Sequence, residues 1–466
     1  MNAHPPVVSD ANLNRLAAIV GAGHLKQGDQ LATVDPGFDR SSLEAGVAVL
    51  PGSAAEVAAI LALADAEHIP IVTHGGRTGL AHAGTSRPGE LILMTSRLTI
   101  IRALDPLGGF AEVEAGVTLA ALDDAAAGHG LSAGIDLGAR GSCTIGGMIG
   151  TNAGGMEAFR YGTMRQRVLG LEAVLPGGRI MRDLTRVTKA NAGYDLKQLF
   201  IGSEGTLGVV TAAVIKLEPV WPARATALVG ALDATRAVTL FRRLQRLPGA
   251  ELTHAELMWR PHVLINAREA GRDGLAAFSS APVFVMFEVG SDSEDACRAA
   301  LETGLSAAIE ASEIDNAILA KSEDERRAIW HLREHWGVDR VYPGGLWFDV
   351  SVPLSGLAAY TEALQARLAS HDPALGLYMI GHLGDGNLHV TVNSDHPILE
   401  RYGEVSTLVY AGLAEIGGSF SAEHGIGLEK KAALAKLADP GKLALMKSIK
   451  KTIDPNGIMN PGKVID

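Results

Sequence analysis

Three histidines and one glutamate, in two short segments far apart in the chain, are the residues best suited to chemistry. The segment GHLGDGNLHV contains His382 and His389, and the segment AEHGIG contains Glu423 and His424. Two imidazoles and one carboxylate can hold a catalytic zinc or a non-haem iron and leave one position open for a substrate. His424 directly follows Glu423, so in an extended backbone its side chain points elsewhere and can act as a base.

A β-hairpin would bring the two histidines of the first segment together. The loop 384–387 lies between the predicted strands 377–383 and 388–392, and its glycines and asparagine tolerate the positive φ of tight turns. A symmetric loop predicts that His382 lies opposite His389, with Cβ atoms roughly 5 Å apart. The alternative is that both segments are polar surface loops, because the sequence alone does not pair them in space.

The composition is that of a soluble globular protein with more than one core. A chain of 466 residues exceeds the size of one ordinary domain, so two domains are expected. The net charge of −11 disfavours nucleic acid or an anionic membrane surface as a partner. No apolar run approaches the ~20 residues of a membrane span, and the first residues do not resemble a secretory signal. Cys143 and Cys297 imply no disulfide framework, Cys143 is expected to be a buried packing residue, and a cytoplasmic location is expected.

Glycine is frequent and clustered, which indicates backbone that approaches a ligand closely. The chain has 55 glycines in 466 residues, against a usual ~7%. They gather in a loop after residue 72, in 137–155 and in 201–211. Neither GxGxxG nor GxxxxGK[ST] occurs, so Rossmann-type NAD binding and P-loop NTP binding are disfavoured. Three such loops suggest one long phosphate-containing ligand held by backbone N–H groups; the alternative is ordinary loops of a glycine-rich α/β protein.

Hydrophobic periodicity predicts helices and strands in two regions joined by the linker Pro219–Pro222. In the first region we expect a helix over 11–25, strands over 47–50 and 69–72, and between the strands a helix that ends near Glu67. Ser53 caps that helix, and Glu56 completes a capping box. In the second region we expect helices over 232–247, 292–310 and 355–370, a strand over 283–289, and a largely helical final segment, 434–466.

Seven strings in a fixed order give the chain a resemblance over nearly its whole length. It is similar to FAD-dependent D-2-hydroxyacid dehydrogenases (D-2-hydroxyglutarate and D-lactate dehydrogenases) of the vanillyl-alcohol-oxidase/PCMH flavoprotein superfamily. The strings are GGRTGL (75–80), GSCTIGGMIGTNAGG (141–155), RYG (160–162), GYDLKQLFIGSEGTLGVVT (193–211), GHLGDGNLHV (381–390), AEHGIG (422–427) and DPNGIMNPGK (454–463).

The resemblance implies an α+β fold in three parts. Residues 1–220 would form a PCMH-type FAD-binding domain of two subdomains, preceded by an N-terminal helix. Residues 221–420 would form an α+β substrate, or cap, domain that carries the metal hairpin. Residues 421–466 would carry the catalytic histidine and return to the FAD domain as a helical segment.

The resemblance also implies where FAD lies, held without a covalent link. The first loop would bind its pyrophosphate through Gly75, Gly76, Arg77, Thr78, Gly79 and His82. The second loop would lie along the flavin and ribityl chain through Gly138, Ser142, Gly146, Thr151, Asn152 and Gly155. The third loop would reach the adenine side through Glu204, Gly208 and Val210, and the tail would bring Asn460 near.

The family's metal ligands correspond to His382, His389 and Glu423, and its catalytic base to His424. A divalent metal, with zinc the best match to the ligand types, would polarise the substrate hydroxyl while the base takes its proton. The substrate side carries Arg333, where the family grips a carboxylate, together with Asn387. The alternative for Arg333 is an exposed helix arginine paired with Glu334 or Asp339.

Three positions depart from the hydroxyglutarate pattern: Trp347 in place of a lysine, Gly337 in place of a threonine, and Thr391 in place of an asparagine. The loss of a cation and the gain of an indole favour a neutral or apolar side chain over a second carboxylate, although Arg340 is another available cation.

The implied partners are a small 2-hydroxy acid and an electron acceptor such as electron-transferring flavoprotein or a quinone, and a homodimer is compatible with the chain. Three alternatives stay open. They are a D-2-hydroxyacid oxidase that uses oxygen, a flavin-independent metal-dependent hydrolase or lyase, and a flavin-binding module without activity.

Overall fold

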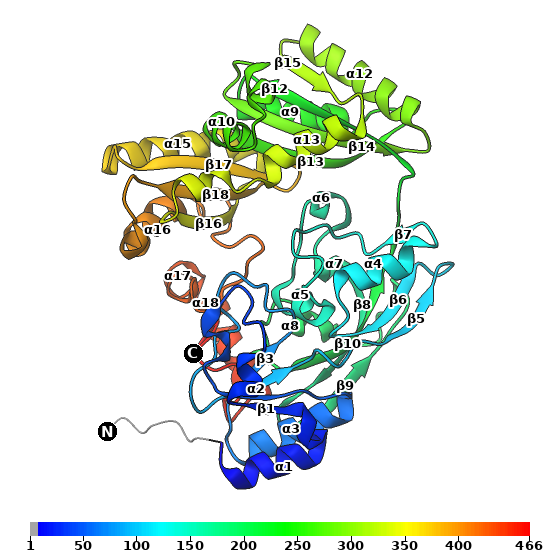
Figure 1. The fold of residues 1–466 in the computed structure, drawn as a ribbon, viewed down its shortest axis with the longest axis vertical. Helices are drawn as coiled ribbons and strands as arrows, with labels where there is room; N and C mark the ends of the chain where they lie inside the picture. Colours follow the sequence, from blue (N-terminus) through cyan, green and yellow to red (C-terminus); the bar gives the residue numbers. More distant parts are fainter. Residues whose placement is uncertain (1–7) are drawn as a thin grey trace. The chain divides into compact units, whose positions relative to one another are not determined.

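The computed structural model describes residues 8–466, which fall into two compact units. The first unit comprises the chain up to Gly155, together with Tyr161–Val220 and Glu423–Asp466. The second comprises Met156–Arg160 and Trp221–Ala422 (Figure 1). The chain passes from the first unit to the second inside the segment PVWP, the predicted linker. No helix within the described residues 8–466 has the length and apolar character needed to cross a membrane.

A small sheet begins the first unit. Its strand order is β1 (Leu25–Gln27), β2 (Val47–Val49), β4 (Leu91–Met94) and β3 (Ile71–His74), and β2 and β3 both run parallel to β4. Helices α1 (Asp10–Val20) and α3 (Ala54–Ala66) pack their apolar side chains against it. The Ser53 hydroxyl accepts the N–H of Glu56, as a helix cap does. The Glu56 carboxylate accepts the N–H of Gly52 at 2.8 Å instead of that of Ser53, so the predicted capping box is shifted by one residue.

A second, antiparallel sheet completes the first unit. Its order is β5 (Ile101–Asp105), β6 (Phe110–Glu114), β10 (Val209–Lys216), β8 (Val168–Val174) and β9 (Ile180–Asp183). Helices α4 (Leu119–Ala127) and α5 (Ile145–Thr151) contribute to its core, which also buries Cys143. Burial raises the pKa of the Cys143 thiol to about 11, which agrees with a packing role.

The C-terminal segment of the first unit is only half helical. Helices α17 (Lys431–Leu437) and α18 (Pro440–Ile453) are followed by irregular chain, so the expectation of a largely helical segment to residue 466 is wrong beyond Ile453. The reason is that Pro455 disfavours helical backbone at the residue before it. The carboxylate of that residue, Asp454, instead accepts the N–H groups of Ile458 and Met459 at 3.0 and 2.9 Å.

The second unit is built on a seven-stranded antiparallel sheet. Its order is β15 (Ile314–Leu319), β12 (Ala223–Ala231), β14 (Val283–Ser291), β13 (Glu251–Trp259), β17 (Gly376–His382), β18 (Asn387–Asn393) and β16 (Leu346–Ser351). Helices α10 (Arg260–Glu269) and α13 (Glu323–Glu334) share one apolar core with β12, β13 and β14. The other helices include α9 (Ala234–Leu244), α12 (Glu294–Glu310), α14 (Gly337–Val341) and α15 (Leu357–His371).

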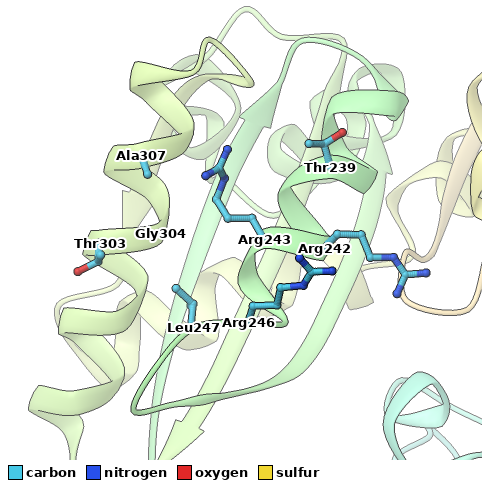
Figure 2. Close-up of a pocket in the computed structure, with 8 residues that line it drawn as sticks. All are labelled: Thr239, Arg242, Arg243, Arg246, Leu247, Thr303, Gly304 and Ala307. Atoms are coloured by element: carbon cyan, nitrogen blue, oxygen red, sulfur yellow. The ribbon is translucent and has the colours of Figure 1, made fainter.

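Helices α9 and α12 lie side by side and line a groove that carries three arginines, Arg242, Arg243 and Arg246 (Figure 2). Gly304 permits this close approach, because an added Cβ would lie 2.7 Å from Leu244. Arg243 is already paired with Glu313 at 2.5 Å. None of the predicted site residues lines this groove.

Candidate active site

The two histidines of the hairpin face each other on one side of the sheet of the second unit. The register pairs His382 with Asn387 and Ile380 with His389, so the prediction that His382 lies opposite His389 is wrong. The turn instead spans residues 383–386, because Leu383 donates its N–H to Ala255 of β13 and Gly386, at φ +77°, donates to the His382 carbonyl. The histidines are therefore diagonal neighbours on one face, and their Nε2 atoms are 3.4 Å apart.

A buried carboxylate lies on the Nδ1 side of each imidazole. His382 Nδ1 lies 2.9 and 3.0 Å from the two oxygens of Glu256, and His389 Nδ1 lies 3.9 Å from Asp349. Both carboxylates are fully buried. A histidine that binds a metal through one nitrogen commonly donates the other N–H to a carboxylate, which fixes its tautomer and orientation. Glu256 therefore holds His382 in an orientation that suits a divalent metal at Nε2, whereas 3.9 Å is too long for a hydrogen bond from His389 Nδ1 to Asp349.

Sequence reasoning did not single out Glu256 as functional. The available signal was a glutamate inside a strand whose neighbours are apolar, ELTHAELMW, since a carboxylate in such a strand needs a buried partner. Asp349, in the stretch DVSVP, was not predicted to be a site residue either. Its position becomes meaningful once β16 pairs with β18, because that pairing places Asp349 directly opposite His389.

Glu256 also holds Arg333, the predicted carboxylate-binding arginine of α13. Arg333 Nε donates to Glu256 at 2.7 Å, and its side chain is only 11% exposed. The alternative of an exposed arginine paired with Glu334 or Asp339 is therefore wrong. Burial raises the pKa of Glu256, but the charges of His382 and Arg333 outweigh burial and hold that pKa at about 2. Glu256 is thus an anion that orients a metal-ligand candidate and a substrate-binding candidate at once.

The other predicted substrate residues share this face of the sheet. Trp347 lies opposite Thr391, one row of the register away from Asp349 and His389. Asn387 lies opposite His382, and its buried Oδ1 atom has no hydrogen-bond partner within residues 8–466. A buried amide oxygen of this kind is suited to a bound ligand.

Glu423 and His424 are the first two residues of the C-terminal part of the first unit. Ala422, the last residue of the second unit, donates its N–H to Asp349 Oδ2 at 3.0 Å. Within the first unit, His424 Nε2 lies 3.8 Å from a Glu423 carboxylate oxygen.

Glu204, predicted to contact the cofactor, braces the loop that follows His424. Its carboxylate accepts the N–H groups of Ile426 and Gly427 at 2.7 and 2.9 Å, and Gly425 approaches it closely with φ +82°. Burial raises the pKa of Glu204 to about 7, although the two N–H groups act in the opposite direction. The order of the loop therefore depends on a carboxylate more than 200 residues away in the chain.

The glycine loops of the first unit come together by backbone contact. A Cβ at Gly76 would lie 2.0 Å from the Ser142 carbonyl oxygen, which joins the first loop to the second. The second and third loops meet where Glu204 donates its N–H to Gly150 at 2.8 Å. The tail closes the cluster, because the Asn460 amide donates to the carbonyls of Ala83 and Glu204 at 3.1 and 2.7 Å. The four predicted cofactor-binding segments thus form one cluster.

This cluster fits the phosphate-rich cofactor that the sequence predicted. Within residues 8–466, the backbone N–H groups from Gly76 to His82 donate to no protein acceptor. Added Cβ atoms at Gly79 and Gly138 would meet open space. Backbone N–H groups in a loop with left-handed residues, here Arg77 and His82 at φ +56° and +60°, form a concave site for anions.

The remaining predicted cofactor residues shape these loops through packing and hydrogen bonds. At Gly75, Gly146, Gly155 and Gly208, an added Cβ would lie within 2.8 Å of another residue. In the first loop, the side chain of Arg77 contacts Asp35 and that of His82 contacts Asp39. In the second loop, Ser142 contacts Ala139, Thr151 contacts Gly147 and Asn152 contacts Arg165. Val210 is buried in β10. Thr78 is partly exposed.

The comparisons with known proteins agree with this geometry. Residues 221–464 match the model of the FAD linked oxidases, C-terminal domain, and residues 45–183 match that of the FAD binding domain. The chain belongs to the FAD-linked oxidases. It is therefore a flavin-dependent oxidoreductase, and FAD is its cofactor.

Relatives with similar chains are named as dehydrogenases. The D-2-hydroxyglutarate dehydrogenase of Xanthomonas citri pv. viticola is 35% identical over 90% of this chain and 88% of its own. The mitochondrial D-2-hydroxyglutarate dehydrogenase of Bos taurus is 33% identical over 98% of this chain and 84% of its own.

Solved structures confirm the predicted α+β fold of the PCMH type. A p-cresol methylhydroxylase superposes with a TM-score of 0.74 at 16% identity and covers 97% of this chain and 96% of its own. An alkyldihydroxyacetonephosphate synthase superposes with a TM-score of 0.72 at 18% identity and covers 99% of this chain and 86% of its own.

Proposed function

We propose that this FAD-linked oxidoreductase is a metal-dependent dehydrogenase that oxidises a D-2-hydroxy acid to the 2-oxo acid. The observation that carries the proposal is the pair His382 and His389, with converging Nε2 atoms and a buried carboxylate near each Nδ1. The names of the relatives, D-2-hydroxyglutarate dehydrogenases, support the class of substrate.

Glu423 is proposed as the third metal ligand, and zinc as the metal. Ala422 is hydrogen-bonded to Asp349, which lies opposite His389 in the sheet. Glu423 is the next residue, so its Cα lies about 3.8 Å from that of Ala422. A carboxylate side chain can reach a metal from there. Two histidines and one carboxylate are a common ligand set of catalytic zinc.

The proposed chemistry divides between the protein and its two bound groups. Arg333 binds the substrate carboxylate through the end of its guanidinium group, while its Nε atom stays on Glu256. His424 accepts the proton of the substrate hydroxyl. A bound metal would supply the Lewis acid that lowers the pKa of that hydroxyl, and bound FAD would supply the acceptor for the hydride of the substrate Cα. Electron-transferring flavoprotein or a quinone is proposed as the acceptor that reoxidises the flavin.

The test is to add D-2-hydroxyglutarate, D-lactate and a larger D-2-hydroxy acid to the purified protein without oxygen and to record the flavin spectrum. At least one of these acids should bleach the yellow band. Treatment with a chelator should abolish bleaching, and zinc should restore it. His424→Asn should slow bleaching by roughly 100-fold or more. The matched control, His371→Asn, changes an exposed histidine that pairs with Glu404 and should leave the rate unchanged.

Two results would contradict the proposal. A preparation that cannot take up FAD but catalyses a metal-dependent hydrolysis would favour the hydrolase alternative. Flavin that none of the acids reduces would exclude oxidation of these substrates. Rapid reoxidation of the reduced flavin by oxygen would indicate an oxidase and would leave the proposed site chemistry intact.

A further inference from the structure

An aromatic row lies next to the histidine pair on the same face of the sheet. The register places Trp347, Thr391 and Tyr378 side by side on β16, β18 and β17. The adjacent row contains Asp349 and His389. Two residues along a strand span about 6.8 Å. A substrate held at the histidines therefore places its side chain within reach of Trp347.

A second indole extends this row. Trp336 connects α13 to α14, and its ring centroid lies 5.8 Å from that of Trp347. Trp336 is 61% exposed and Trp347 is 41% exposed. Tryptophan is on average a highly buried residue, so two neighbouring indoles with this exposure form an open apolar surface.

The charges around this surface do not suit a second carboxylate. Trp347 occupies the position where the hydroxyglutarate pattern expects a lysine. Arg333 is held by Glu256, and Arg340 lies close enough to His335 to help burial lower the pKa of that histidine. The carboxyl group beside the indole is Asp339; burial raises its pKa, and interaction with Trp347 partly offsets this.

The missing threonine at Gly337 has a structural cause. An added Cβ there would lie 2.6 Å from Asn266 Oδ1. The Asn266 amide group donates to the carbonyls of Leu332 and His335 at 3.0 and 2.7 Å, and so it caps the end of α13. A side chain at residue 337 would displace this cap, so no hydroxyl can be supplied from there.

We infer that the substrate is a D-2-hydroxy acid with an aromatic side chain, which packs against Trp336 and Trp347. This inference rests on the proposed function, because it assumes that the reacting carbon lies at the histidine pair. Ring stacking on the indoles would take the place of the second ion pair that a dicarboxylate needs.

The test compares kcat/KM for D-3-phenyllactate and D-2-hydroxyglutarate, measured on the FAD- and zinc-loaded protein with an artificial electron acceptor. The native protein should prefer phenyllactate by roughly 10-fold or more, as expected where an exposed indole stands in place of a lysine. Trp347→Lys should lower that ratio by at least about 10-fold, because it removes the indole and supplies a cation. Trp336→Ala should lower kcat/KM for D-3-phenyllactate and leave kcat/KM for D-2-hydroxyglutarate unchanged. The control Trp221→Phe alters an indole bonded to Glu251 and should keep the native ratio.

The outcomes separate this inference from the function on which it rests. A native preference for D-2-hydroxyglutarate, or a ratio that neither variant changes, overturns the aromatic substrate and leaves the dehydrogenase proposal standing. If neither acid nor D-lactate reduces the flavin, the proposed function itself is overturned. If Trp347→Lys fails to fold, the native ratio and Trp336→Ala still decide.

Discussion

Replacing Glu256 by glutamine should weaken metal binding, although the Glu256 side chain is a partner of the candidate ligand His382 and not itself a candidate ligand. The carboxylate accepts His382 Nδ1 at 2.9 and 3.0 Å and Arg333 Nε at 2.7 Å. Glutamine carries no charge, and its NH₂ group replaces one of the two oxygens that lie 2.9 and 3.0 Å from His382 Nδ1, so His382 loses the charged acceptor behind its candidate metal-binding nitrogen. Zinc affinity should therefore fall by roughly 10- to 100-fold, the usual effect of removing the carboxylate behind a ligating histidine.

The same substitution should also destabilise the second unit. One charge-assisted hydrogen bond is lost, which costs about 1.5–3 kcal/mol, and Arg333 keeps a largely buried charge without its counterion. Zinc affinity is measured by competition with a fluorescent chelator at constant pH, and the free energy of unfolding by urea titration of the zinc-free, FAD-loaded protein.

Glu288→Gln is the matched control. Glu288 is also fully buried on this face of the sheet, and it accepts from Thr226, Trp330 and Arg326 at 2.7, 2.9 and 3.0 Å. Its loss should destabilise the unit to a similar extent but leave zinc affinity unchanged, because these three donors are not candidate metal ligands. The reasoning is refuted if both variants lose zinc affinity equally, or if Glu256→Gln binds zinc as tightly as the native protein does.

Three further predictions concern the first unit. Gly76→Ala should lower the melting temperature of the FAD-free protein, because the new Cβ would lie 2.0 Å from a backbone oxygen at Ser142. Gly79→Ala, which meets open space, should keep that melting temperature and weaken only FAD binding, as a flavin-fluorescence titration would show; equal melting temperatures for the two variants would contradict the packing argument. Glu204→Gln should remove a pH dependence of stability. The pKa of Glu204 is raised from 4.5 to about 7, so its protonated form contributes stability below pH 4.5 that is lost as the pH rises through 7, roughly 3 kcal/mol in urea titrations. Parallel pH profiles for the native protein and the Glu204→Gln variant would contradict this assignment.

Local features of the sequence determined much of the fold. Ser53 begins α3 because a hydroxyl cap needs only the N–H groups of the next turn. The segment PVWP marks the passage between the units, and the glycine loops cluster because their backbones approach too closely for a Cβ. The spacing of His382 and His389 around a turn sufficed to predict that they lie close together in one hairpin, but it gave the wrong register. The cap, the linker and the turn depend on residues close together in the chain, whereas the clustering of the glycine loops also requires distant contacts such as that of Gly76 with Ser142.

Only the tertiary structure decided how the site is supported. The hairpin turn is shifted by one residue, and each strand partner by two, because Leu383 bonds to β13, a strand more than 100 residues away in the sequence. The same neighbouring strand supplies Glu256 to His382 and Arg333, and a distant loop supplies Glu204 to the chain after His424. Such partners are fixed by which strands and loops become neighbours, and that choice minimises the free energy of the whole core. No short stretch of sequence contains this information, and for that reason the partners of Glu256 could be recognised only in the folded chain.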